Sequence, residues 1–304
     1  MNHAAKGSLP RLLVIGARGF LGTFLASRAS RHYEVFRADR SRESAESDVV
    51  VDVVDAAKVR AAFDAVQPNA VVLLAAISDI DRCQRDPELA VSVNLRGAEH
   101  VANACARSGA RLLFTSTAAV FDGCKQSYSE EDEVSPSSVY GETKAQAEAV
   151  VQALAPSATI VRVSLVLGRT GKTGTNSLLD SMMRRWNAGE VVSASVLESR
   201  NAIDAGTLSQ WMLELLQDER NRGIFHAGAT EARTRYQLAQ AVAQHLDVPA
   251  ALVKAELQPA AGRAPRGAHH FLSTSKINKA CATQSPSWEV VIERSLNEVA
   301  EGSL

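Results

Sequence analysis

An open parallel sheet of the α/β class is the fold that the sequence predicts, and three observations support it. Between residues 11 and about 168, short β-branched or aliphatic runs alternate with helix-like stretches, as in sheets wrapped by crossover helices. A turn with glycines at positions 16, 19 and 22 directly follows the first of these runs. The chain has 304 residues, 46% of them hydrophobic, which is enough to bury a sizeable core. We therefore expect a Rossmann-type doubly wound parallel sheet over residues 1–168.

The individual strands and helices follow from local pattern. Asp55 precedes the helical pattern of residues 56–66, and Asp86 precedes Pro87, a residue suited to the first position of a helix. These helical segments are therefore expected to be crossovers between parallel strands. The expected strands are residues 11–15, 33–38, 70–76, 111–116 and 159–166.

The pattern changes after Gly168, where polar loops such as residues 168–177 and shorter elements begin. We expect residues 169–304 to form a smaller, mixed substrate-binding part, intertwined with the first and completing its site. A Pro- and Gly-bearing loop is expected at 258–270. The other elements expected here are helices at 177–189, 206–218 and 236–247 and strands near 191–195 and 223–228.

Composition restricts the classes of partner. The formal net charge is -1 and no long run of one sign occurs, which argues against a nucleic-acid or membrane surface and favours a small molecule. The opening residues predict neither a signal peptide nor a membrane span. The four cysteines are widely spaced, so neither a disulfide framework nor a zinc site is indicated, and we expect a cytoplasmic protein. A homodimer is one assembly that the sequence allows.

The glycine turn predicts a dinucleotide site. Backbone there can approach a pyrophosphate without obstruction by a Cβ, and the following helix offers unpaired N–H groups and a positive dipole end. The alternative is a plain glycine turn, since the spacing G-x-x-G-x-x-G departs from the commoner G-x-G-x-x-G, but its place after the first strand favours the cofactor. The cofactor-binding residues expected in this turn are Gly16, Arg18, Gly19, Phe20, Leu21 and Gly22.

Residues at the ends of later strands complete the expected cofactor site. Asp39 follows the second strand, where its carboxylate could bind the adenosine ribose and repel a 2′-phosphate, which favours NAD(H) slightly. Arg18 and Arg40 could instead attract that phosphate, or simply be solvated. The remaining residues expected around the cofactor are Asp52 and Val53 beside the adenine, and Ala75 and Ala76 after the third main strand.

A tyrosine, a lysine and a threonine are the expected catalytic residues. Tyr140 and Lys144 lie four residues apart at the start of the helical pattern of residues 140–154, so they share one face. We expect the ammonium to lower the phenol pKa from its usual ~10 so that Tyr140 acts as a general acid. Thr117 ends a strand at the edge where the cofactor crevice should open. The alternative is an exposed helix face, because Y-x-x-x-K occurs often by chance.

In these three places the sequence resembles the extended short-chain dehydrogenases/reductases: GARGFLG at the turn, STAAVF at the strand end and YGETK on the helix. Within that superfamily, the segments 87–123, 135–148 and 266–277 resemble the dTDP-4-dehydrorhamnose reductase group. The resemblance covers nearly the whole chain. It implies Thr117, Tyr140 and Lys144 as catalytic residues, with Tyr140 and Lys144 also touching the cofactor. It further implies that Arg162 and Ser164 flank the nicotinamide.

Two alanines mark a departure from the family patterns. The reductase group commonly has an Asp-Tyr pair after the catalytic threonine, and related dehydratases have an Asp-Glu pair, where this chain has Ala118 and Ala119. The resemblance therefore implies an NAD(P)-dependent reductase of a keto-sugar nucleotide, with hydride from nicotinamide and a proton from Tyr140, and argues against 4,6-dehydration. Two alternatives remain open: a nucleotide-sugar epimerase, and a non-catalytic dinucleotide-binding subunit resembling the methionine adenosyltransferase beta subunit.

Overall fold

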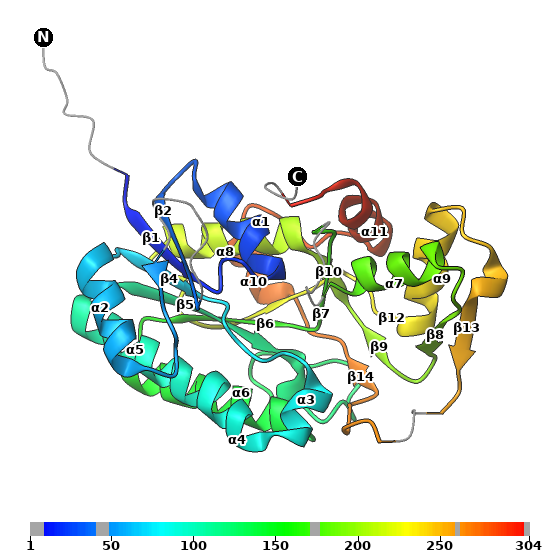
Figure 1. The fold of residues 1–304 in the computed structure, drawn as a ribbon, viewed down its shortest axis with the longest axis horizontal. Helices are drawn as coiled ribbons and strands as arrows, with labels where there is room; N and C mark the ends of the chain where they lie inside the picture. Colours follow the sequence, from blue (N-terminus) through cyan, green and yellow to red (C-terminus); the bar gives the residue numbers. More distant parts are fainter. Residues whose placement is uncertain (1–8, 41–48, 171–176, 259–261, 301–304) are drawn as a thin grey trace, which may run out of the picture.

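A seven-stranded parallel sheet forms the centre of the computed structural model, which describes residues 9–40, 49–170, 177–258 and 262–300 (Figure 1). Residues 1–8 and parts of the loops expected at 168–177 and 258–270 lie outside the described residues. The doubly wound α/β fold class is thereby confirmed. In spatial order the strands are β11 (Gly223–Ala227), β6 (Thr159–Val163), β5 (Arg111–Thr117), β4 (Ala70–Leu73), β1 (Arg11–Ile15), β2 (Glu34–Asp39) and β3 (Val49–Val50).

Two strands are shorter than the apolar sequences from which they were predicted. The backbone N–H groups of Leu74 and Ala75 both donate to the Ile15 carbonyl, at 2.9 and 3.0 Å, so β4 leaves the sheet after Leu73. The expected strand at 159–166 divides into β6 and β7 (Leu165–Leu167), and β7 pairs with β10 (Ala202–Asp204) outside the main sheet. Both departures lie at the carboxyl edge of the sheet.

Helices cover both faces of the sheet (Figure 1). Alternate residues of each strand face two separate cores: Leu13 and Phe114 belong to the core on one face, Leu12 and Leu113 to the core on the other. The first face is covered by α2 (Ala56–Val66), α5 (Gly97–Ser108) and α6 (Val139–Leu154), and the second by α1 (Phe20–Ala29), α8 (Ala205–Gln217), α10 (Ser275–Ala280) and α11 (Trp288–Asn297).

Two helix starts agree with the predicted capping residues. The Asp55 carboxylate accepts from the Ala57 and Lys58 N–H groups at the start of α2. Asp86 accepts from the Leu89 N–H, and Pro87 takes the first position of the next short helix. Between β4 and α5 the chain forms α3 (Ile80–Arg85), α4 (Pro87–Ala90) and a π-helical turn, η1 (Val91–Arg96).

The second half of the chain contributes to the main sheet as well as to smaller ones. β11 is an edge strand paired with β6, although the sequence suggested that it would lie in the smaller part. The division of the chain at residue 168 stays a prediction. The smaller elements are α7 (Leu178–Asn187), β8 (Val192–Ser195), β9 (Ser199–Arg200), β12 (Arg233–Thr234), α9 (Arg235–His245), η3 (Ala250–Leu252), β13 (Val253–Glu256) and β14 (His269–His270).

A late segment, residues 263–272, returns from the smaller part to the first half of the chain, and we call it the strap. Arg266 forms an ion pair of 2.7 Å with Asp81 on α3. The His269 N–H donates to the Gly123 carbonyl at 3.0 Å, and Leu272 pairs with Tyr128. The strap therefore connects the smaller part to the loop that follows β5.

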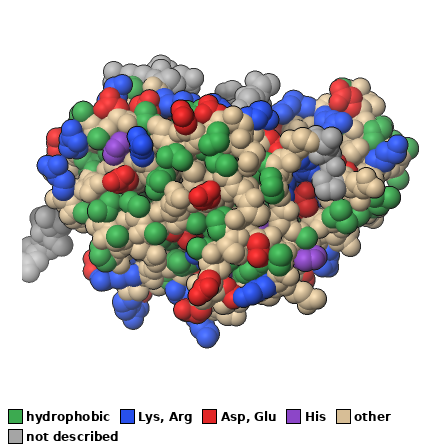
Figure 2. All heavy atoms as spheres, turned by 90° about the horizontal axis from the view of Figure 1, so that it is seen from below, with side chains coloured by type: hydrophobic (Ala, Val, Ile, Leu, Met, Phe, Trp, Pro, Cys, Tyr) green, Lys and Arg blue, Asp and Glu red, His purple; other side chains and the backbone are tan. Residues whose placement is uncertain are grey.

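The surface carries charges of both signs. On the face shown in Figure 2, acidic and basic side chains are interspersed with apolar ones, in keeping with the net charge of -1. Among the helices of the described residues, none combines the length and the apolar character that crossing a bilayer requires.

Candidate active site

The glycine turn between β1 and α1 is packed against the ends of two neighbouring strands. Gly16 has a φ of +90°, and a Cβ there would lie 2.7 Å from the Ala75 nitrogen. Its own N–H donates to the Ala38 carbonyl at 2.8 Å. At Gly22 an added Cβ would lie 2.6 Å from the Cα of Ala17. Only glycine suits these two positions, because one needs left-handed backbone and both lack room for a side chain.

The start of α1 meets the requirements of an anion site. Gly19 is its N-cap residue and supplies no side-chain hydrogen bond, and the first turn contains no acidic residue. The N–H groups of this turn are therefore not used by a capping side chain and carry the positive end of the helix dipole. A helix start of this kind favours a phosphate or another anion.

The expected adenosine-side residues lie together beside the turn. The Val51 N–H donates to the Asp39 carbonyl at 2.9 Å, which places residues 51–53 against the end of β2. Asp39 accepts from the backbone N–H of Arg40 at 2.7 Å, and Asp52 accepts from that of Val54 at 3.2 Å. Val53 is buried. The carboxylates of Asp39 and Asp52 thus belong to neighbouring segments at the carboxyl edge of the sheet.

The remaining predicted cofactor residues differ in what their side chains contact. Phe20 is buried and packs edge-on against Phe24, with ring centroids 5.8 Å apart, so only its backbone is available at the turn. Leu21 packs into the same core. After the end of β4, Ala75 is partly exposed and Ala76 is exposed. Arg40 is exposed, whereas Arg18 is partly buried.

The structure brings Tyr140 and Thr117 together by close backbone packing. Thr117 ends β5 and caps the short helix η2 (Ala118–Val120), accepting from the Ala119 N–H at 3.1 Å. Gly141, the third residue of α6, lies directly on Ala119, and a Cβ at position 141 would overlap the Ala119 carbonyl oxygen. The N-terminus of α6 is thereby held against η2, which sets the Tyr140 phenol near enough to the Thr117 side chain for Thr117 to lower the pKa of the phenol.

Lys144 lies one turn further along α6 and is 2% exposed. Its ammonium donates to the Thr115 carbonyl at 2.7 Å and lies 3.9 Å from the centre of the Phe114 ring. Asn94 of η1 supports the same helix, because its amide donates to the Ile77 carbonyl at 3.0 Å and to the Thr143 hydroxyl at 3.4 Å. These contacts fix the side of α6 that carries Tyr140 and Lys144.

The protonation of the pair differs from the expectation. Burial raises the pKa of Tyr140 to about 12, against the opposing effect of the Thr117 side chain. The expected lowering by Lys144 is wrong here, because that ammonium contacts Thr115 and Phe114 and does not contribute to the Tyr140 shift. Burial also lowers the pKa of Lys144 to about 7, with Glu148 opposing. At neutral pH the phenol therefore keeps its proton and can donate it to an adjacent oxygen.

Arg162 and Ser164, which the resemblance placed beside the nicotinamide, are both engaged with the protein. Arg162 forms a fully buried ion pair with Glu148, with Nη2 and Oε2 2.6 Å apart, and its guanidinium lies 5.0 Å from the Phe121 ring centre. The Ser164 hydroxyl donates to the His270 carbonyl at 2.8 Å. Arg162 therefore joins α6 to β6, and Ser164, between β6 and β7, joins this part of the chain to the strap.

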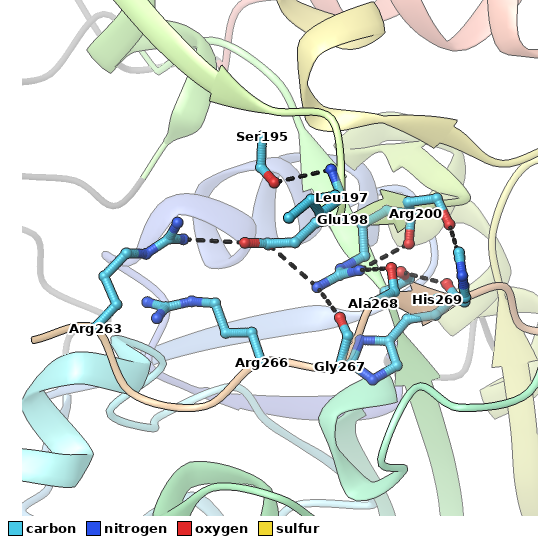
Figure 3. Close-up of polar contacts among 12 residues, drawn as sticks. Ser195, Leu197, Glu198, Arg200, Arg263, Arg266, Gly267, Ala268 and His269 are labelled. Carbon is cyan, nitrogen blue, oxygen red and sulfur yellow. Dashed lines mark hydrogen bonds and ion pairs between the residues drawn. The ribbon is translucent and has the colours of Figure 1, made fainter. Parts of the chain in front are cut away.

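Sequence reasoning missed a cavity in the smaller part. It has a volume of about 280 Å³ and lies between α7, β8, β13 and the start of α9. Apolar Leu178, Met182 and Val192 line it together with charged side chains, among them Arg235, Glu198 and Arg263. Because these charges come from separate elements, no local spacing in the sequence could have revealed them. The strap joins the cavity to the loop that follows β5, since Arg263 lines the cavity and Gly267 packs on Gly123 (Figure 3).

Comparison with known proteins places these features in a family context. Residues 10–301 match the family model described as the RmlD substrate binding domain. A dTDP-4-dehydrorhamnose reductase of Mycobacterium tuberculosis is 30% identical over 300 residues, covering 95% of this chain and 93% of that protein. Its counterpart from Aggregatibacter actinomycetemcomitans is 28% identical, covering 92% and 96%. Methionine adenosyltransferase 2 subunit beta of Xenopus laevis is 26% identical, covering 94% and 87%.

Solved structures share the fold over nearly the whole chain. A dTDP-4-dehydrorhamnose reductase from Bacillus anthracis in complex with NADP has a TM-score of 0.86 at 22% identity, covering 96% of this chain and 99% of that chain. The Bordetella bronchiseptica enzyme WbmG in complex with NAD and UDP has a TM-score of 0.81 at 22% identity, covering 95% and 94%. At sequence identities of 22%, these two similarities show a shared fold.

Proposed function

The chain belongs to the RmlD substrate binding domain family, and on that premise we propose that it is a nicotinamide-dependent reductase of a keto-sugar nucleotide. The dTDP-4-dehydrorhamnose reductases among its relatives support this class of reaction. The neighbouring structures with NADP, and with NAD and UDP, support a nicotinamide cofactor and a nucleotide-linked substrate.

The observation that carries the proposal is the packing of Gly141 on Ala119, which sets Tyr140 beside Thr117 at the carboxyl edge of the sheet. A keto oxygen between these two hydroxyls would accept hydrogen bonds from both. A reduced nicotinamide, when bound, would supply the hydride for the keto carbon. Tyr140, which holds its proton at neutral pH, gives that proton to the oxygen, so a ketone becomes an alcohol with hydride and proton accounted for.

The cradle at the start of α1 would hold the pyrophosphate of the cofactor, and Asp39 with Asp52 would bound the adenosine end. Within the proposal we retain a slight preference for NAD(H), because the Asp39 carboxylate is at the end of β2 where a 2′-phosphate would meet it. Lys144 fixes the position of α6 relative to β5 through its hydrogen bond to the Thr115 carbonyl.

Simple reduction is favoured over dehydration by the two residues after Thr117. Eliminating water from the sugar requires an additional acid or base, and the methyl groups of Ala118 and Ala119 cannot transfer a proton. Reduction needs only the groups already named. The cavity in the smaller part, at about 280 Å³, is close to the range of roughly 300–1,000 Å³ for small-molecule sites and suits part of a nucleotide.

The test of the proposal is the stoichiometry of cofactor use. With a dTDP-4-keto-6-deoxyhexose and NAD(P)H, we expect one cofactor oxidised for each hydroxyl formed. An epimerase would convert a nucleotide-sugar without net oxidation, and a binding subunit such as the one among the relatives would bind NAD(P)H without consuming it. Formation of a 4-keto-6-deoxy product from dTDP-hexose and oxidised cofactor would refute the preference for reduction over dehydration.

A further inference from the structure

A buried ion pair lies one helical turn beyond Lys144. Glu148 follows Lys144 by four residues on α6, so the two side chains share the face of the helix that packs on the sheet. The Glu148 carboxylate accepts from the Arg162 guanidinium of β6, from Nε at 3.0 Å and from Nη2 at 2.6 Å. The exposed fractions of the Arg162 and Glu148 side chains are 2% and 4%, so solvent ions screen this pair very little.

His226 and Phe121 hold the other side of the Arg162 guanidinium. Nη1 lies 3.4 Å from Nε2 of His226 on β11. A guanidinium can only donate, so this ring nitrogen is the acceptor and the imidazole is neutral. Burial lowers the pKa of His226 to about 3, in agreement with this assignment. The ring of Phe121, four residues after Thr117, lies 5.0 Å from the guanidinium. Arg162 therefore contacts α6, β11 and the segment that follows Thr117.

The Glu148 carboxylate is the charge that acts on Lys144. The Lys144 ammonium donates to the Thr115 carbonyl and lies over the Phe114 ring, and neither of these groups is charged. Burial lowers the pKa of Lys144, and the Glu148 carboxylate opposes this effect. The ion pair therefore fixes a negative charge one turn away from an ammonium that is costly to bury.

Three further titratable groups on or beside α6 are neutral near pH 7. Tyr140, on α6 itself, has a pKa of about 12. Burial raises the pKa of the Cys83 thiol on α3 and that of the Cys105 thiol on α5, and both helices pack on α6. These groups therefore do not change their charge in the pH range in which Lys144 titrates.

We propose that Glu148 and Arg162 form a positioning pair for the reduction, in which Glu148 keeps Lys144 charged and Arg162 holds the Glu148 carboxylate in place. The inference rests on the proposed function for the reaction that the pair supports. A charged ammonium is a stronger donor to the Thr115 carbonyl than a neutral amine is. The pair therefore acts through Lys144 on the contact that sets α6, and with it Tyr140, against β5.

The test follows the charge of Lys144 directly, by ¹³C NMR of the full chain labelled at the lysine Cε atoms. The Lys144 signal is identified by its absence from Lys144→Arg. We expect a pKa of about 7 for Lys144 in the wild type. In Glu148→Gln the midpoint should move to lower pH by about 1 pH unit, because a charge that favours the ammonium is lost. Glu142→Gln is the matched control, because Glu142 is exposed on the same helix and its loss should leave the midpoint unchanged.

A double variant separates the effect of the carboxylate from the effect on stability. Glu148→Gln alone leaves the buried Arg162 charge unpaired, which destabilises the fold. Combining Glu148→Gln with Arg162→Met removes both charges, so this protein should unfold at a temperature closer to that of the wild type than the single variant does. Its Lys144 midpoint should still lie below that of the wild type, because the carboxylate is missing.

A wild-type midpoint in folded Glu148→Gln would overturn the inference, because the carboxylate would then have no influence on Lys144. A wild-type midpoint in the double variant would also overturn it, because the unpaired Arg162 would then be the cause of the change in Glu148→Gln. If neither variant folds, the pair serves the fold alone and the inference is again wrong.

Kinetics connect the charge of Lys144 with the reduction. With a dTDP-4-keto-6-deoxyhexose and NAD(P)H, kcat/KM should fall as Lys144 loses its charge, and this fall should move to lower pH in both variants by the same amount as the NMR midpoint. A fall that stays at the wild-type pH while the midpoint moves would overturn the role in the reduction. A displaced midpoint in proteins that oxidise no cofactor would support the control of Lys144 by Glu148 and count against the proposed function.

Discussion

Gly141 lies so close to Ala119 that a side chain at position 141 would overlap the Ala119 carbonyl oxygen and lie 3.0 Å from its carbonyl carbon. This contact joins the helix that carries Tyr140 and Lys144 to the strand end that carries Thr117. The relative position of the hydroxyls therefore depends on the absence of a single methyl group.

Replacing Gly141 by alanine should separate α6 from η2. We expect kcat to fall by about tenfold or more, with a loss of roughly 1–3 kcal/mol in stability from overpacking. Steady-state kinetics and denaturant unfolding measure the two effects. Gly189→Ala is the control, because a Cβ there meets nothing within 4 Å and its cost is limited to the positive φ of 72°. Normal turnover in folded Gly141→Ala would contradict the role given to this contact.

The sequence was most informative where a signal is local. Asp55 and Asp86 predicted two helix starts, and the glycine spacing predicted the tight turn between β1 and α1, because capping and close backbone approach depend on neighbouring residues. The partner of a strand is not encoded locally, which is why β11 could be expected as a strand but not placed at the edge of the main sheet. The same limit applies to Arg235 and Arg263, which line one cavity only after the chain has folded.

The shared helix face of Tyr140 and Lys144 was predictable from the sequence, but the protonation of the two side chains was not. Spacing on a helix showed that Tyr140 and Lys144 share one face. The direction of the Tyr140 pKa shift depends on burial and on which groups Lys144 contacts, and both follow from the packing of α6 against β5. Arg162 illustrates the same point, since its partner Glu148 lies on another element.

Removing the phenolic hydroxyl of Tyr140 should remove the proton donor and leave the rest of the site in place. We expect Tyr140→Phe to lower turnover by about 100-fold or more while the affinity for the dinucleotide stays close to that of the wild type. Turnover and cofactor titration report the two quantities separately. Tyr236→Phe, a partly buried tyrosine on α9, serves as the control. Near-normal turnover of Tyr140→Phe would remove Tyr140 from the mechanism.

The activity should depend on the charge of Lys144. Its lowered pKa, about 7, means that the ammonium is present below this pH and is lost as the pH rises through it. Tyr140, with a pKa of about 12, keeps its proton throughout this range. We therefore expect kcat/KM to decline above a pH of about 7. Lys144→Arg should be less active but should lack this decline, because the guanidinium stays charged. The same decline in both proteins would show that another group titrates.

Asp39 should control the choice between cofactors. Removing its carboxylate in Asp39→Ala should leave Arg40 and Arg18 as the charged groups near the ribose end, so the ratio of NADP(H) to NAD(H) affinity should rise by about tenfold. Titration of all four cofactor forms measures this ratio. Glu34→Ala, at the other end of the same strand, is the matched control. Tighter binding of NADP(H) than NAD(H) by the wild type would reverse the preference.

The most direct test of the account follows the hydride itself. The protein is supplied with a dTDP-4-keto-6-deoxyhexose and NAD(P)H that carries deuterium at the transferable position of the nicotinamide, and the product is analysed by mass spectrometry and NMR. We predict one deuterium at the carbon that bore the keto group, with one equivalent of cofactor oxidised, and loss of this transfer in Tyr140→Phe. Binding of both compounds by the wild type without deuterium in the sugar would contradict the claim that this chain is a reductase.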